Sequence, residues 1–180
     1  MSQIGRRRGW LWAWWLCCLL CCGLVRAEPL VLDSVNAVHP RGAQVAVLED
    51  ASGTQTLAQV QAVGSGVHGG WQALQGESPS FGYSRSVYWL RVTLLNRHAT
   101  QTAWQFGVQY PLLDEVDLFV VDGTGRVQQH HATGDRRPFG ARPVAHPHFY
   151  VDVPLQTGAQ ATVYVRLRSE GSLQAPLVVT

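Results

Sequence analysis

The segment Ser86–Leu95, SVYWLRVTLL, decides the fold, because apolar side chains recur at every second position along it. In a β-strand, successive side chains point to opposite faces of the sheet. One face would carry Tyr88, Leu90, Val92 and Leu94, and the other Val87, Trp89, Arg91 and Thr93. The first set can face a core, whereas the second mixes an indole with a guanidinium. The segment is therefore predicted to be a strand with one core-facing side.

The chain beyond residue 27 repeats this pattern in short apolar runs, separated by Gly, Pro, Asp and Asn. The predicted strands are Leu30–Val35, Gln44–Glu49, Ser86–Leu95, Ala103–Val108, Glu115–Val121, Arg126–Ala132, His148–Leu155, Ala161–Arg168 and Gln174–Val179. Asp122-Gly123-Thr124-Gly125 is a predicted hairpin turn, because glycine adopts positive φ without steric cost. Thr56–Val63 fits either a strand or a short helix. This pattern predicts an all-β domain, an antiparallel β-sandwich of jelly-roll, galactose-binding-like type.

The outward positions of four predicted strands share an unusual chemistry. They are Trp89, Arg91, Asp117, Phe119, His148, Tyr150, Asp152, Tyr164, Arg166 and Arg168. An ordinary solvated face would carry Thr, Ser, Lys, Glu and Gln instead.

We expect a ligand-binding face for a small polar molecule, a sugar or a carboxylate. Trp89, Tyr150 and Tyr164 would supply stacking or apolar contact. Arg91 and Arg166 would donate to ligand oxygens, and Asp117 would accept from hydroxyls. Two alternatives stay open: the strands belong to different sheets and never meet, or Trp89 and Tyr164 only cover an edge of the core.

Residues 1–27 have the order of a secretory signal peptide. Arginines at positions 6 to 8 precede the apolar run WLWAWWLCCLLCCGLV, which ends at Val25-Arg26-Ala27. The run is shorter than the ~20 residues of a comfortable membrane span. An uncleaved N-terminal anchor and a lipid-modified Cys21 or Cys22 are the alternatives. All three readings place residues 28–180 outside the cytoplasm, as one ligand-sensing domain.

Charge and cysteine content exclude several functions for residues 28–180. All four cysteines lie within the leader, so the remainder has no thiolate metal site and no disulfide. The chain has 14 basic residues, all arginine, and removal of the leader's four leaves ten against 12 acids, a net charge of about −2. No nucleic-acid partner is expected, since a basic patch would be needed.

Four runs, taken in order, carry a family resemblance. They are FGYSRSVYWLRVTLLN (Phe81–Asn96), WQFGVQYPLLDEVDLFVVDGTG (Trp104–Gly125), TGDRRPFGARPVAHPHFYVDVPL (Thr133–Leu155) and TVYVRLRSEGSLQAPLVV (Thr162–Val179). Together they resemble the second extracellular domain type of bacterial seven-transmembrane receptors with diverse intracellular signalling modules (7TMR-DISM). The resemblance covers about Leu30 to Thr180.

The resemblance implies a jelly-roll sandwich that binds carbohydrates or other small ligands, ahead of seven membrane helices and a cytoplasmic output. Any enzymatic activity, such as a diguanylate cyclase or a histidine kinase, would lie in that output and not in this domain. We expect a receptor cut short after its sensor, membrane-anchored in the full-length parent, with a homodimer as an option and no cofactor. The alternative is a free secreted carbohydrate-binding module.

A metal-dependent, cupin-like enzyme is the competing class. His146, His148 and Asp152 resemble the first metal-binding motif of cupins, and imidazole with carboxylate suits zinc, manganese or iron. Two features weaken this assignment. Cupins carry Glu where this chain has Asp152, and no histidine follows His148 to complete the ligand set. His130 or His131 would have to substitute.

Overall fold

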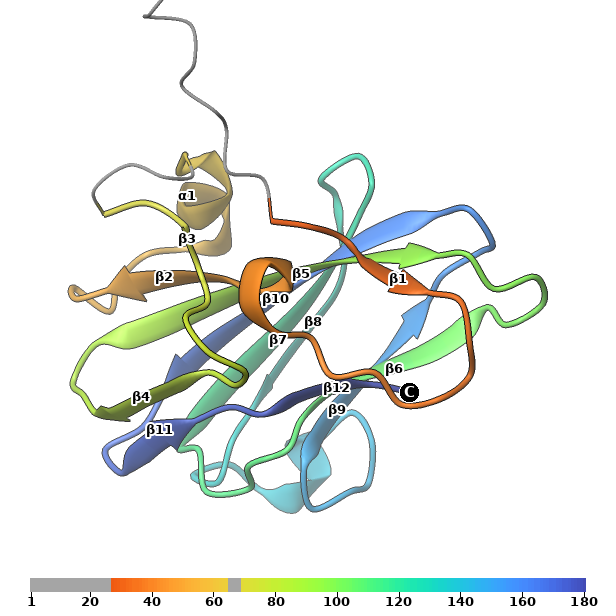
Figure 1. The fold of residues 1–180 in the computed structure, drawn as a ribbon. Coiled ribbons are helices and arrows are strands. Elements are labelled where there is room, and N and C mark those ends of the chain that lie inside the picture. The colour runs from red at the N-terminus through yellow and green to blue at the C-terminus, as the bar shows by residue number, and fades with distance from the viewer. Residues whose placement is uncertain (1–26, 65–68) are drawn as a thin grey trace, which may run out of the picture.

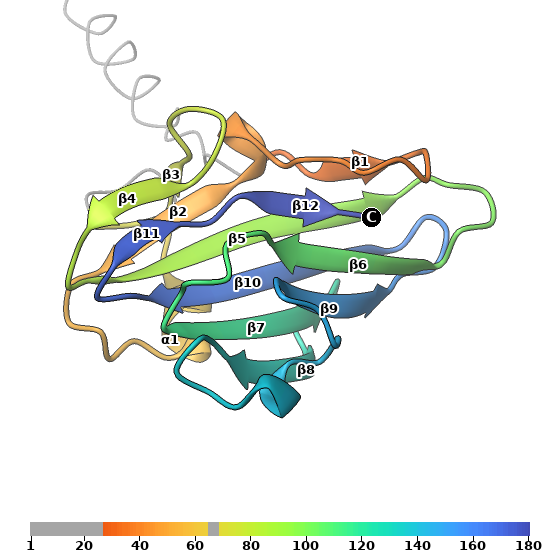
Figure 2. The same cartoon turned by 90° about the horizontal axis from the view of Figure 1, so that it is seen from below.

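The fold is a sandwich of two β-layers around one apolar core (Figures 1 and 2). The computed structural model describes residues 27–64 and 69–180. The strands are β1 (Leu30–Leu32), β2 (Ala46–Asp50), β3 (Gln72–Ala73), β4 (Ser80–Tyr83), β5 (Val87–Asn96), β6 (Ala103–Val108), β7 (Glu115–Asp122), β8 (Val127–Thr133), β9 (Phe149–Pro154), β10 (Gln160–Arg168), β11 (Ser172–Gln174) and β12 (Leu177–Val179). The predicted signal peptide lies outside the described residues, apart from Ala27.

The larger layer is a seven-stranded sheet in the order β3-β2-β5-β10-β7-β8, with β1 paired to β5. All its pairs are antiparallel except β1 with β5. The second layer consists of the three-stranded sheet β12-β6-β9 and the two-stranded sheet β11-β4. The chain crosses repeatedly between the layers, for example from β5 to β6 to β7 and from β8 to β9 to β10. The predicted all-β, jelly-roll-type sandwich is confirmed.

The core lies where the predicted inward positions of the two layers meet. Leu90, Val92 and Leu94 of β5 are fully buried, as the alternation in the opening segment predicts. The other fully buried positions include Leu118 of β7, Val165 of β10, and Phe106, Phe149 and Val151 of the second layer. Burial of such side chains contributes about 1.5–3 kcal/mol each, so these positions provide most of the drive for folding.

A second, smaller apolar cluster covers the opposite face of the large sheet. It contains Ala46, Leu48, Val60, Trp71, Val87, Trp89, Val121 and Tyr164. Val60 belongs to α1 (Leu57–Ala62), a helix whose first turn is capped by the hydroxyl of Thr56. The open choice for Thr56–Val63 is thus settled as a helix. We call this face of β2, β5, β10 and β7 the outer face, and α1 with Trp71 its cover.

Two of the strand expectations need correction. The predicted strand Gln174–Val179 is two strands, because the chain leaves β11 at Ala175-Pro176 and joins the second layer as β12. Proline has no N–H for a sheet ladder, so a break there is expected. The strands β3 and β4 were not predicted. None of the helices in the described residues is long and apolar enough to cross a membrane.

Candidate functional site

The register of β5, β10 and β7 brings five of the six predicted ligand-binding residues onto the outer face. Tyr164 of β10 pairs with Arg91 of β5, and Arg166 pairs with Trp89 on one side and Asp117 on the other. Residues at paired positions point to the same face of a sheet. Trp89, Arg91, Asp117, Tyr164 and Arg166 therefore form one continuous set, although they come from three separate stretches of sequence.

Two of these five residues pack beneath the cover. Trp89 is 1% exposed and Tyr164 is 7% exposed. The Trp71 ring meets Tyr164 edge to face at 6.0 Å between centroids, and its Nε1 donates to the Val60 carbonyl at 2.9 Å. A ligand could stack on Trp89 only if α1 and Trp71 moved away. The two rings thus belong to the smaller apolar cluster on the outer face, and neither is open to a ligand in this structure.

The polar members of the set are bound to protein groups as well. The Arg166 guanidinium lies 3.2 Å from Asp117 and 3.4 Å from Glu115, and it also donates to the Gly53 carbonyl. Its side chain is 18% exposed. Arg91 lies over the Trp71 ring, 4.5 Å from the centroid, which is a cation–π arrangement. Both arginines therefore contact other protein groups on the outer face, and the Arg166 side chain stays partly exposed to solvent.

His130 extends this charged row to the edge strand β8. Its ring stacks on Phe119 at 4.1 Å between centroids, and its Nε2 lies 3.4 Å from Asp117. Asp117 thus accepts contacts from two basic groups, Arg166 and His130. The predicted acceptor for ligand hydroxyls is already engaged, so a ligand would have to compete for it or share it.

Tyr150 does not share the outer face. It lies on β9 in the second layer, where Gln109 donates to its hydroxyl at 3.2 Å and the His146 ring meets it edge to face. Its ring lies directly over Gly107 of the neighbouring strand β6. The alternation correctly predicts that Tyr150 points outward, but it points outward from the other sheet. Tyr150 therefore lies apart from the other five predicted residues, on the other layer of the sandwich.

The geometry does not favour a metal at His146, His148 and Asp152. Strands rise about 3.3 Å per residue, so Asp152 lies roughly 13 Å from His148 along the chain. His146 Nδ1 accepts from the His148 amide at 3.0 Å, and Asp152 accepts from Gln105 at 2.8 Å. In the described part of the chain, no group of three or more His, Cys, Asp or Glu side chains could hold a metal ion.

Two pockets are lined in part by β10, one by its first half and the other by its last residue. The first, the Tyr164 pocket, has a volume of about 580 Å³. Its polar lining comes from Glu28, Gln61, Thr93, Asp122, Gln160, Thr162 and Tyr164. Thr93 and Thr162 are paired across β5 and β10, and their hydroxyls lie 3.3 Å apart. The neutral groups donate and accept hydrogen bonds, and the carboxylates of Glu28 and Asp122 add negative charge to the pocket.

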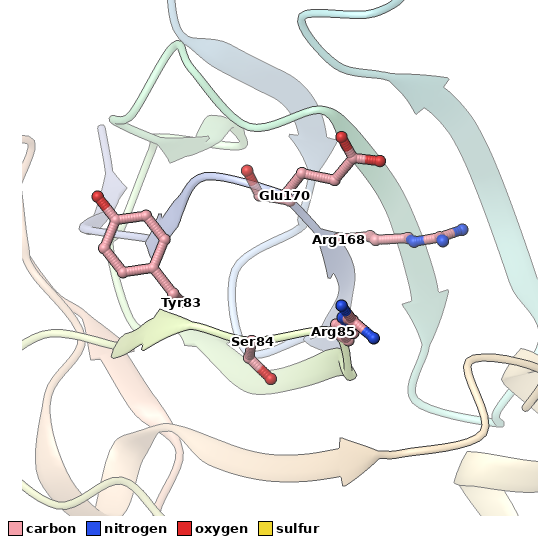
Figure 3. A pocket seen from close by; sticks show the side chains of 6 residues that line it. Tyr83, Ser84, Arg85, Arg168 and Glu170 are labelled. Carbon is pink, nitrogen blue, oxygen red and sulfur yellow. The ribbon is translucent and has the colours of Figure 1, made fainter.

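The second pocket, the Arg85 pocket, has a volume of about 610 Å³ and lies at the other end of β10 (Figure 3). It is lined by Tyr83, Ser84, Arg85, Arg168, Ser169 and Glu170. Sequence reasoning placed Arg168 among the outward residues but missed the other five. The sequence feature that could have indicated this pocket is the run FGYSR at residues 81–85. In it Tyr83 is followed two residues later by Arg85, just before a predicted strand.

Comparison with known proteins agrees with this architecture. The family model described as 7TMR-DISM extracellular 2 matches residues 42–180. No curated protein matches the chain. The matched region includes β2 through β12, α1, the whole lining of the Arg85 pocket at residues 83–85 and 168–170, and the Tyr164 pocket except Ala27, Glu28 and Pro29. The family is that of an extracellular domain, which places these residues outside the cytoplasm. The chain belongs to the 7TMR-DISM extracellular 2 family.

Proposed function

We propose that this domain is the ligand-sensing part of a bacterial membrane receptor, and that it binds a small polar molecule, a sugar or a small carboxylate, without changing it chemically. The observation that carries the proposal is the outer face. Five of the residues predicted to recognise a ligand lie next to one another there, and one of them, Tyr164, lines the Tyr164 pocket. The parent receptor would be anchored by its membrane helices, with any enzymatic activity in its output domain.

The chemistry of the Tyr164 pocket suits a polyhydroxylated ligand. The hydroxyls of Thr93 and Thr162 and the amides of Gln61 and Gln160 can each donate and accept. The Tyr164 ring contributes an aromatic edge, a combination common in sites for small polar molecules. Ligand contact at this point would act on α1, because Gln61 lies on α1 and also reaches the Gly125 carbonyl at 3.5 Å.

Sensing then follows from the position of the cover. A ligand that binds more tightly to one arrangement of α1 and Trp71 than to another shifts the population of the two arrangements. Such a shift is a signal that a membrane receptor can transmit. Binding without chemistry is sufficient for this role, and no catalytic group is needed in the domain.

A thermal-shift screen of the purified protein against neutral sugars, amino acids and small carboxylates tests the proposal. At a concentration of 100 times Kd, a ligand stabilises by about 2.7 kcal/mol. For a domain of this size that raises Tm by roughly 5–10 °C. Gln160→Ala and Thr162→Val should weaken the response to the ligand found, and Arg91→Ala should do the same if the face acts as a unit.

Gln156→Ala is the matched control, since Gln156 is an exposed glutamine in the turn before β10 that lies outside the Tyr164 pocket. It should leave the response unchanged. A screen without any stabilising compound, or a response that none of the three site variants reduces, contradicts the proposal.

A further inference from the structure

The Arg85 pocket is formed by two turns that the sheet pairing holds side by side. Ser84–Ser86 connects β4 to β5, and Ser169–Gly171 connects β10 to β11. β5 pairs with β10 and β4 pairs with β11, so both turns are fixed at both ends. In Figure 3, Tyr83 at the end of β4 is followed by Ser84 and Arg85 of the first turn, and Arg168 at the end of β10 precedes Glu170 of the second. Turns held in this way by a rigid scaffold are common positions for binding residues.

The pocket offers guanidinium groups that the protein does not fully neutralise. Arg85 is exposed and has no hydrogen-bond or ion-pair partner within residues 27–64 and 69–180. Arg168 is 53% exposed and makes one loose pair, 3.7 Å from Glu115. An exposed pair of this kind contributes little to stability, so Arg168 can turn toward a ligand at small cost.

The carboxylate that also lines the pocket is already paired. Glu170 accepts from Arg136 at 2.6 and 3.2 Å, in a two-point arrangement on the guanidinium. The hydrogen bond from Arg136 lowers the pKa of Glu170, and the charge of Arg136 acts in the same direction. Arg136 is shared between Glu170 and Asp114, which lies 3.5 Å from it, so it neutralises Glu170 only in part. Arg85 is the cation of the pocket that the described residues leave unpaired, and Arg168 has only its 3.7 Å pair with Glu115.

Two neutral groups complete the lining. Tyr83 is 84% exposed, an unusually open position for an aromatic side chain at the end of a strand. Its ring can lie against a flat apolar face, and its hydroxyl can donate or accept. Ser169 is 2% exposed and accepts from the Gly171 amide at 3.2 Å, which leaves its hydroxyl proton for another oxygen.

We propose that the Arg85 pocket binds a monocarboxylated sugar ring: Arg85 and Arg168 donate to the carboxylate, and Tyr83 packs against the ring. Guanidinium groups match the two oxygens of a carboxylate geometrically. A single negative charge fits better than two, because Glu115 and Glu170 lie close to the same arginines and repel added charge. This site is separate from the Tyr164 pocket, about four residues along β10, and does not depend on it.

Isothermal titration of the purified protein with sodium glucuronate tests the proposal, with three comparison solutes. Glucose has the ring without the charge, acetate has the charge without the ring, and phosphate has a higher charge. Glucuronate should bind at least about tenfold more tightly than each, because a charge-assisted hydrogen bond and a ring contact each contribute about tenfold. Glucuronate binding should weaken as salt rises, since both arginines are exposed.

Arg85→Gln and Tyr83→Ser should each weaken glucuronate binding by about tenfold, with little change in Tm because both side chains are exposed. Arg97→Gln is the matched control: Arg97 is an exposed arginine just beyond the other end of β5, and its removal should leave binding unchanged. Gln160→Ala should also leave it unchanged, which separates this site from the Tyr164 pocket.

Several outcomes would overturn the proposal. Equal binding of glucose and glucuronate would show that the charge is not recognised. Equal binding of acetate and glucuronate would show the same for the ring, and tighter binding of phosphate would contradict the preference for one charge. Wild-type affinity in Arg85→Gln, or an equal loss in Arg97→Gln, would show that the pocket is not the site.

Discussion

Replacing Trp71 by alanine is the sharpest test of the cover on the outer face. Trp71 is 1% exposed, its Nε1 donates to the Val60 carbonyl, and its ring contacts Tyr164 and Arg91. Truncation of a buried tryptophan costs about 3–5 kcal/mol. The hydrogen bond adds about 1 kcal/mol. Because the cover can partly collapse onto the sheet, we expect a loss near the lower limit of this sum, about 4 kcal/mol.

The substitution should also destabilise α1 more than it destabilises the rest of the domain. α1 has six residues, too few to remain helical without its contacts. Hydrogen exchange of Trp71→Ala should therefore show faster exchange at the α1 amides, such as Val60, while β5, β10 and β7 keep their protection. Urea denaturation gives the free energy of unfolding of the same sample.

Trp104→Ala is the matched control, because Trp104 is equally buried but belongs to the main core. It should lower the protection of both layers together. Trp71→Phe keeps an aromatic ring and should cost only about 1–2 kcal/mol, mainly for the hydrogen bond. The reasoning is refuted if Trp71→Ala costs less than about 1 kcal/mol or leaves the α1 amides fully protected.

Three further predictions concern single residues. Gly134→Ala should lower the free energy of unfolding by about 3 kcal/mol, because Gly134 has φ +136° and a Cβ there would overlap the Asp114 carbonyl; wild-type stability in urea denaturation would contradict this. Thr56→Ala should cost about 1 kcal/mol through loss of the α1 cap, measured in the same way, and Thr56→Ser should retain most of it. The hydrogen bond from Thr124 lowers the pKa of Asp122 to about 2, so the ionised side chain stabilises the fold above its ordinary value of 3.8, and this contribution is lost as pH falls toward 2. Asp122→Asn should therefore be less stable than wild type at neutral pH, and the difference should shrink in thermal unfolding between pH 4 and pH 2; a difference independent of pH would rule out the carboxylate as the cause.

Side-chain alternation was enough to predict the faces of the central strands. The predicted inward positions of β7, β9 and β10 are buried, and so are Leu90, Val92 and Leu94 of β5. Alternation did not predict that Trp89 and Tyr164, on the opposite face, are buried as well. The turn at Asp122–Gly125 also follows from the sequence, with Gly125 at φ +89°. These features depend on near neighbours in the chain.

The cover and the pockets depend on contacts between distant segments, which alternation does not contain. The alternation of side chains along β5 does not indicate that Trp89 packs in one cluster with Val60 of α1. The sequence of α1 itself was compatible with either a strand or a helix. Tyr150 illustrates the same point, because its outward direction was predictable but its sheet was not. The Arg85 pocket arises only when the β4–β5 and β10–β11 turns meet. β4 itself is a short strand, SFGY, whose glycine lies between two aromatic residues and whose sequence has no clear period of two.

The central claim is that ligand binds on the outer side of the large sheet, and amide chemical-shift mapping tests it most directly. Labelled protein is titrated with the sugars and small carboxylates that stabilise it in the thermal screen. We predict that the amides of Thr93, Gln160, Thr162 and Tyr164 shift together, with those of α1 following. Shifts confined to β6, β9 and β12, around Tyr150, would contradict the claim.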